Sequence, residues 1–155
     1  MSKHQDLLEG FRHFAASAPD TAALMTHIAQ QLHDQMARYN WVGFFLVDPA
    51  DPGMLIVGHY VGFTPIECIP INKGLCGTAA TTRQTIVVND VAADPRYLSG
   101  SELVKSNMVV PIFARNQLVA ELDIESYFTN TFSKAEQTFV EAVAQVVGKF
   151  MEKKP

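Results

Sequence analysis

The stretch Glu121-Leu122-Asp123-Ile124-Glu125 is the part of the sequence with the most unusual chemistry. Side chains alternate across a β-strand, so its acidic residues would share one face and its aliphatic residues the other. Neighbouring carboxylates repel one another and are costly to bury without partners. We therefore expect compensation from solvent, from Lys or Arg neighbours, or from a cationic ligand group such as an ammonium.

An aromatic residue bears on the choice between these interpretations. Trp41 opens an apolar segment that is predicted to form another strand. If that strand lies beside the acidic one, the ligand interpretation gains support, because an indole face and carboxylates together suit an ammonium group.

Cys68 and Cys76 are the candidate nucleophiles. Cys76 falls near the start of a short helix predicted from Gly74, where backbone N–H groups can lower the pKa of a thiol. A disulfide to Cys68 would form only if the intervening turn folds back. The alternative is that both are reduced structural cysteines. A metal site is disfavoured, since the sequence has no Cys-x-x-Cys and its histidines show no ligand spacing with the cysteines.

Composition limits the function classes. The chain has 155 residues, which suits a single domain over residues 1–155, and a net charge of −4, which argues against nucleic-acid and anionic-membrane partners. We expect no membrane span and no signal peptide. Two cysteines do not form a disulfide framework, so a cytoplasmic protein with reduced thiols is expected. No phosphate-loop or serine-nucleophile motif occurs, and no cofactor is expected.

The N-terminal half must supply helices and a central strand. Apolar spacing predicts one helix over residues 4–16 and a second, capped by Asp20, that runs to about Tyr39. Residues 41–48 form a predicted strand that is apolar on both faces and therefore central. A turn at residues 48–53 and a returning antiparallel strand over residues 54–61 are expected to follow.

The C-terminal half completes the predicted sheet. We expect a short strand at residues 85–89, a long connection at 90–106 with one turn at 94–97, and a hairpin formed by strands 107–114 and 118–127. Ser133 and Glu136 match a capping box at the start of a C-terminal helix. Helices at both ends of an antiparallel meander make the fold class α+β.

These motifs together resemble the GAF domain, and in particular the small single-domain GAF proteins that include free methionine-(R)-sulfoxide reductase. The matching stretches are Asn40-Trp41-Val42-Gly43-Phe44-Phe45, Ile69-Pro70 leading to Lys73-Gly74-Leu75-Cys76-Gly77-Thr78-Ala79-Ala80, Val109-Val110-Pro111-Ile112, and Leu122-Asp123-Ile124-Glu125-Ser126. The resemblance covers about residues 20–150. It implies a central antiparallel sheet with the N- and C-terminal helices on one face. A ligand pocket would lie on the other face, closed by the segments 68–83 and 90–106. It also implies a homodimer that forms through the terminal helices.

The resemblance assigns the ligand-binding residues. Trp41 matches the pocket tryptophan, Asp123 a pocket acid, and Glu125 replaces a second Asp. Phe45 stands where the reductases have a Tyr, and Asn107 stands where they have a substrate-contacting Glu.

The cysteines and one acid depart from the family pattern. Cys76 matches the family's motif cysteine, but Gly100 falls where the reductases keep the attacking cysteine, and Ile66 where they keep the principal resolving one. Glu121 is unusual, since the pattern has an aliphatic residue there.

These departures lead to a binding module as the first hypothesis. It would hold an amine-bearing small molecule, such as a free amino acid or methionine sulfoxide, against Trp41, Phe45, Asn107, Asp123 and Glu125, without ordinary reductase activity. The alternative is a free methionine-(R)-sulfoxide reductase that uses Cys76 and Cys68 as a redox pair, with a thioredoxin-type reductant.

Overall fold

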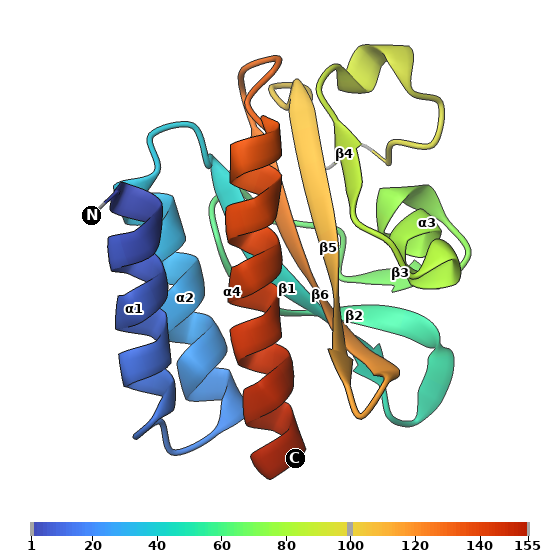
Figure 1. Ribbon diagram of the computed structural model, residues 1–155. Coiled ribbons are helices and arrows are strands. Elements are labelled where there is room, and N and C mark those ends of the chain that lie inside the picture. Colours follow the sequence, from blue (N-terminus) through green and yellow to red (C-terminus); the bar gives the residue numbers. More distant parts are fainter. Residues whose placement is uncertain (1, 99–100, 155) are drawn as a thin grey trace.

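The computed structural model describes residues 2–98 and 101–154, which form a six-stranded antiparallel sheet and the helices around it (Figure 1). The strands are β1 (Trp41–Asp48), β2 (Asp51–Val61), β3 (Cys68–Pro70), β4 (Ile86–Val88), β5 (Ser106–Ala114) and β6 (Gln117–Ser126). The helices are α1 (Lys3–Ala15), α2 (Thr21–Gln35), α3 (Gly74–Thr82), the short 3-10 helix η1 (Val91–Ala93) and α4 (Lys134–Lys153). The predicted α+β class is confirmed. None of the described helices is long and apolar enough to cross a membrane.

The strand order β3-β2-β1-β6-β5-β4 places the two strands of greatest interest side by side at the centre. β1 pairs with β6 in antiparallel register, with Trp41 opposite Glu125 and Phe45 opposite Glu121. Because β1 is flanked by β2 and β6 and carries apolar side chains on both faces, the prediction of a central strand is confirmed.

Helices α2 and α4 cover one face of the sheet, α1 packs against both of them, and together the three helices enclose the larger core (Figure 1). Val42 and Phe44 of β1 and Leu122 of β6 point into this layer and are fully buried. The apolar stripe of α4 packs against the same face. These contacts fix the orientation of β1 and β6, and alternation then sends Trp41, Phe45 and the acids of β6 to the opposite face.

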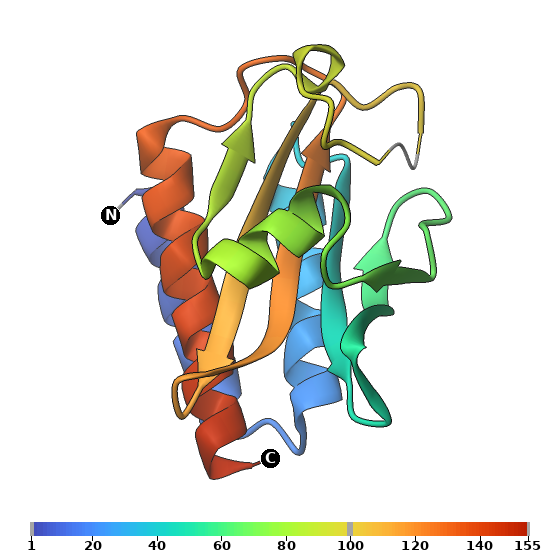
Figure 2. The same ribbon diagram turned by 90° about the vertical axis from the view of Figure 1, so that its right-hand side faces the viewer.

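The opposite face is covered by α3, which lies across β5 and β6 (Figure 2), and by the segments 89–98 and 101–105. A second, smaller apolar cluster forms there. Its buried members are Trp41, Phe45, Leu55, Ile69, Leu75, Cys76, Ala79, Val88, Val91, Val104 and Val109. This layer contains short elements and long loops, so it is the part of the fold suited to enclosing a ligand.

Two predictions about the helices need correction: the end of α2 and the capping box of α4. α2 ends at Gln35 rather than near Tyr39, because Tyr39 is drawn into the core and donates a hydrogen bond from its hydroxyl to Glu136 Oε1 at 2.7 Å. Only half of the predicted capping box forms, since Ser133 Oγ accepts from the Glu136 N–H at 3.3 Å. The Glu136 carboxylate is instead engaged by Tyr39 and by His4, whose Nε2 lies 2.6 Å away.

The turn predicted at residues 48–53 is shorter than expected. β2 already begins at Asp51, and its first residues pair with the end of β1 through Asp48 opposite Asp51. The predicted turn at residues 94–97 is present, with the Tyr97 N–H bonded to the Asp94 carbonyl at 3.3 Å.

Candidate functional site

The acids of β6 all lie on the face that α3 covers. Glu121, Asp123 and Glu125 have exposed fractions of 0%, 6% and 7%. The interpretation that they form a solvated face is therefore wrong. Alternation is the physical reason, because Leu122 and Ile124 are required by the large helical core and fix the opposite orientation for the acids.

Two of these acids have hydrogen-bond donors. Asp123 Oδ1 accepts from Asn107 Nδ2 at 2.6 Å, and the Cys76 thiol lies 3.8 Å from Asp123 Oδ2. Glu125 Oε1 accepts from the Tyr97 hydroxyl at 2.9 Å. Asn107 stands opposite Glu125 on the neighbouring strand β5, which places it between the two acids.

Glu121 is different, because its carboxylate is buried without such donors. Among the residues that the structure describes, neither oxygen of its carboxylate has a hydrogen-bond partner. The nearby Cys76 thiol lowers the pKa of Glu121, but by less than burial raises it. A buried carboxyl in this state stays protonated well above its ordinary range.

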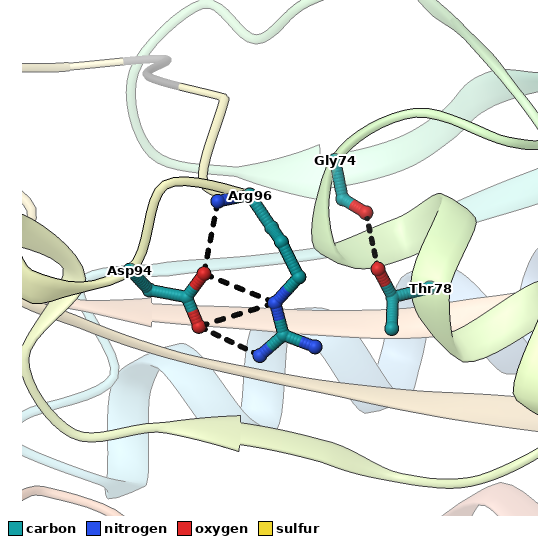
Figure 3. A network of polar contacts seen from close by, with 4 residues as sticks. All are labelled: Gly74, Thr78, Asp94 and Arg96. Atoms are coloured by element: carbon teal, nitrogen blue, oxygen red, sulfur yellow. Dashed lines mark hydrogen bonds and ion pairs between the residues drawn. The ribbon is translucent and has the colours of Figure 1, made fainter.

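Burial also raises the pKa of the other two acids, to about 7 for Asp123 and about 8 for Glu125. Hydrogen bonds from Asn107 and Tyr97 offset only part of this rise. No basic side chain neutralises these acids: within residues 2–98 and 101–154 the ion pairs are His4–Glu136, His33–Asp34 and Arg96–Asp94. Figure 3 shows that the Arg96 guanidinium donates hydrogen bonds to both carboxylate oxygens of Asp94, in the connection after η1.

Cys76 lies in the first turn of α3, where backbone N–H groups can lower the pKa of a thiol. Here burial raises the pKa of Cys76 well above its usual range, and Asp123, Glu121 and Glu125 raise it further, which agrees with the alternative of a reduced structural cysteine. The N-terminus of a helix carries only a partial positive charge, which lowers the pKa of a thiol in its first turn by a small amount. Complete burial beside three acids outweighs it.

Cys68 occupies a different environment. It lies on the short edge strand β3, where its side chain is exposed while that of the next residue, Ile69, is buried. Both cysteines are free thiols, one exposed and one buried. Cys68 is not among the residues that line the cavity beside Cys76.

The cavity beside the acids is small, with a volume of about 40 Å³. Its lining residues are Phe45, Ile66, Ile69, Gly74, Leu75, Cys76, Tyr97, Leu98, Asn107, Asp123 and Glu125. Four of the predicted ligand-binding residues are thus brought together around it. The fifth, Trp41, lies behind Phe45: its ring stacks on Tyr60, and its Nε1 donates to the Phe63 carbonyl at 2.9 Å.

The mouth of the cavity is formed by Leu98, which sequence reasoning did not select, and by Ile66, which it named only as the replacement of a cysteine. Leu98 and Ile66 line it and are exposed by 43% and 37%. Leu98 lies against Gly74, whose φ of +68° and close approach leave no room for a side chain. Sequence reasoning placed Tyr97 only within a turn. No periodic pattern in the sequence predicts its hydrogen bond to Glu125, because that contact joins a loop residue to a distant strand.

The start of α3 adds a second polar feature. Lys73 makes no side-chain capping bond, and the first-turn residues Gly74, Leu75 and Cys76 all line the cavity. Backbone N–H groups without partners at a helix start favour negative charge. The Thr78 hydroxyl turns away to its own helix and donates to the Gly74 carbonyl at 2.9 Å (Figure 3).

Gly100, at the position where the reductases keep the attacking cysteine, lies outside the described residues. Ile66, at the position of the resolving cysteine, lines the cavity. Within the part of the chain that the structure describes, no three His, Cys, Asp or Glu side chains converge in a way that could hold a metal ion.

Comparison with known proteins gives consistent results. The model of the GAF domain family matches residues 20–150. The chain is 27% identical over 147 residues to "Free methionine-R-sulfoxide reductase" of Saccharomyces cerevisiae, covering 94% of this chain and 80% of that protein.

Two solved structures share the fold closely. The free methionine-R-sulfoxide reductase of Neisseria meningitidis, in complex with its substrate, has a TM-score of 0.91 at 28% identity over 96% of this chain and 88% of that one. The reduced form of fRMsr of Staphylococcus aureus has a TM-score of 0.90 at 29% identity over 97% and 96%.

Proposed function

The chain belongs to the GAF domain family, and on that premise we propose that it binds a small molecule that carries an ammonium group. A free amino acid, with methionine sulfoxide as the first candidate, is the ligand class. The observation that supports this proposal is the buried row of acids on β6, none of which takes part in an ion pair among the described residues. A ligand ammonium would supply the missing positive charge and let Asp123 and Glu125 ionise.

The two ends of an amino acid fit the two polar features of the cavity. An ammonium would lie against Asp123 and Glu125, and a carboxylate would face the uncapped start of α3 at Gly74 and Leu75. Asn107 already bonds Asp123 through one amide hydrogen and fixes the orientation of that carboxylate. Phe45 supplies an apolar wall for the ligand side chain.

Binding requires the cavity to open. Ligand pockets measure about 300–1,000 Å³, whereas the enclosed space is about 40 Å³. The exposed side chains of Leu98 and Ile66 are the parts of the lining that can move with the least loss of packing. We therefore propose that the side chains of Leu98 and Ile66 form the lid of the cavity.

We infer that ordinary reductase activity is absent. Sulfoxide reduction needs a thiolate at the sulfur and a second thiol that resolves the sulfenic acid. The high pKa of Cys76 keeps it as the thiol at neutral pH, and the cavity wall near it carries Ile66 rather than a cysteine.

A reductase is the second candidate function, and the similarity of the chain to free methionine-R-sulfoxide reductases favours it. In that reaction Cys76 would attack the sulfoxide sulfur and become a sulfenic acid as methionine leaves. Cys68 would then attack the sulfenic sulfur, which releases water and forms a disulfide that a thioredoxin-type dithiol reduces. Mass spectrometry after incubation with methionine-(R)-sulfoxide decides between the two. A Cys68–Cys76 disulfide with free methionine supports the reductase, and two free thiols with unchanged sulfoxide support the binding module.

Calorimetric titration of the native protein with methionine sulfoxide and other free amino acids tests the proposal. Asp123→Asn keeps the shape of the side chain and removes its charge, so affinity should fall about 10- to 150-fold, the equivalent of one charged hydrogen bond. Glu9→Gln, at an exposed position on α1 and outside the cavity lining, is the matched control and should bind as the native protein does. No heat with any amine, or equal heat from Asp123→Asn, contradicts the proposal.

A further inference from the structure

Glu121 is the one acid of β6 that the proposed amino-acid site leaves unused. It is fully buried on the same face as Asp123 and Glu125, and its oxygens have no hydrogen-bond partner among the described residues. On the flanking strands it stands opposite Phe45 and Pro111, neither of which carries a donor in its side chain. Its carboxylate therefore has no structural partner within the sheet.

The helix above the sheet offers only a weak donor. The threonine hydroxyls of α3 return to its own backbone: Thr78 to Gly74 at 2.9 Å, Thr81 to Gly77 at 3.0 Å and Thr82 to Thr78 at 2.7 Å. The Cys76 thiol lies near Glu121, but a thiol is a weak hydrogen-bond donor and offsets only part of the cost of burying the carboxyl group. An aliphatic residue would fill this position without burying an unpaired polar group.

Glu121 nevertheless lies close to the cavity. Cys76 interacts with both Glu121 and Asp123, and it also lines the cavity. Glu121 is therefore one small side chain behind the cavity wall. Residues two apart on a strand are separated by about 6.8 Å, so Glu121 follows Asp123 at roughly the length of an extended amino-acid side chain.

We propose that Glu121 receives a second cationic group, so that the ligand is a basic amino acid whose side chain passes Cys76 and ends on the Glu121 carboxylate. This inference rests on the proposed function, because the α-ammonium occupies Asp123 and Glu125 in both. Within the amino-acid ligand class, it places lysine, ornithine and arginine ahead of methionine sulfoxide in affinity.

Charge balance supports this choice. A neutral amino acid brings one ammonium to three buried acids and leaves Glu121 as it is in the free protein. A basic amino acid brings a second positive charge, and a buried ion pair with good geometry is far more favourable than either buried charge alone. The second cation therefore acts as a specificity element, because it is absent from competing neutral amino acids.

The test compares lysine with norleucine, which has the same length but no terminal ammonium, by calorimetry at one pH. Native protein should bind lysine at least about tenfold more tightly than norleucine, as expected for one charged contact. In Glu121→Gln and Glu121→Leu that ratio should fall to about one, while norleucine affinity should stay within about threefold of the native value. Circular dichroism melts confirm that both variants are folded. Because glutamine is polar and leucine is not, the same affinity ratio in both variants would show that the loss of the carboxyl group, and not a change in polarity, is the cause.

Each other outcome has a distinct meaning. If norleucine and lysine bind equally well to the native protein, the inference about Glu121 is overturned and the amine-binding function stands. The same holds if methionine sulfoxide, which offers an acceptor oxygen, depends on Glu121 and lysine does not. If no amino acid binds, the proposed function fails together with the inference.

Discussion

Replacing Glu121 with leucine should make the protein more stable, although the residue is fully buried. The oxygens of the native carboxyl are buried without a hydrogen-bond partner among the described residues, and the nearby Cys76 thiol offsets the cost of burial only in part. Removing one unsatisfied buried polar group is worth about 1–3 kcal/mol. For a chain of this size, each kcal/mol raises the melting temperature by about 2–4 °C.

The gain should increase with pH, and its sign follows from the proton balance. Burial raises the pKa of Glu121 in the folded state well above 4.5, so the folded state keeps a proton that the unfolded chain has lost. The stability of the native protein is then greatest below the unfolded pKa and falls as pH rises toward the folded pKa, by up to about 1.4 kcal/mol per pH unit. Glu121→Leu lacks this proton, and its stability should fall less steeply.

Urea denaturation at pH 5.5, 6.5 and 7.5 measures both effects. Glu121→Gln is the informative comparison, because it removes the titration but keeps an unsatisfied polar group, so it should flatten the pH profile and stabilise less than leucine. Glu9→Gln, at an exposed position on α1, controls for the loss of one negative charge. If Glu121→Leu is less stable than the native protein at pH 7.5, or has the same pH profile, the account of this buried acid is wrong.

Two further predictions concern glycines and thiols. Gly148→Ala should lower the free energy of unfolding by about 1–3 kcal/mol, since a methyl group there overlaps the Phe113 carbonyl oxygen where α4 crosses β5. Gly10→Ala in α1 has open space around it and should raise the free energy of unfolding by about 0.5–1 kcal/mol. Thermal melts that shift both variants in one direction would contradict this packing. Iodoacetamide at pH 8 should alkylate exposed Cys68 at least about tenfold faster than buried Cys76, as peptide mass spectrometry would show, and equal rates would mean that Cys76 is open to solvent.

Much of the fold follows from local patterns in the sequence. β1 begins and ends where its run of aromatic and branched residues does, and the alternation in β6 correctly put its acids on one face. These features depend on neighbours within a few residues, which a sequence displays directly. The end of α2 was misplaced because it depends on Tyr39 reaching Glu136, a contact between residues far apart in the chain.

The candidate site was predictable in its residue types and less so in its chemistry. Phe45, Asn107, Asp123 and Glu125 meet around one cavity as expected, because strand register alone brings them together. The sequence left the chemistry of Cys76 open between an activated thiol and a structural cysteine, since helix position is visible in the sequence while complete burial beside three acids is not. Tyr97 and Leu98 were missed because their loop has no repeating pattern to orient them.

The central claim is that an amine binds against acids that the free protein keeps protonated. Titrating the native protein with methionine sulfoxide and with lysine at pH 6.5, in two buffers of different ionisation enthalpy, measures the protons exchanged on binding. Because the pKa values of Asp123 and Glu125 are about 7 and about 8 without ligand, the α-ammonium of either ligand should lower both and release about one to two protons. Lysine should release about one proton more, from Glu121, whose pKa is also raised by burial. Binding with no proton release, or no binding of either amine, would contradict the account.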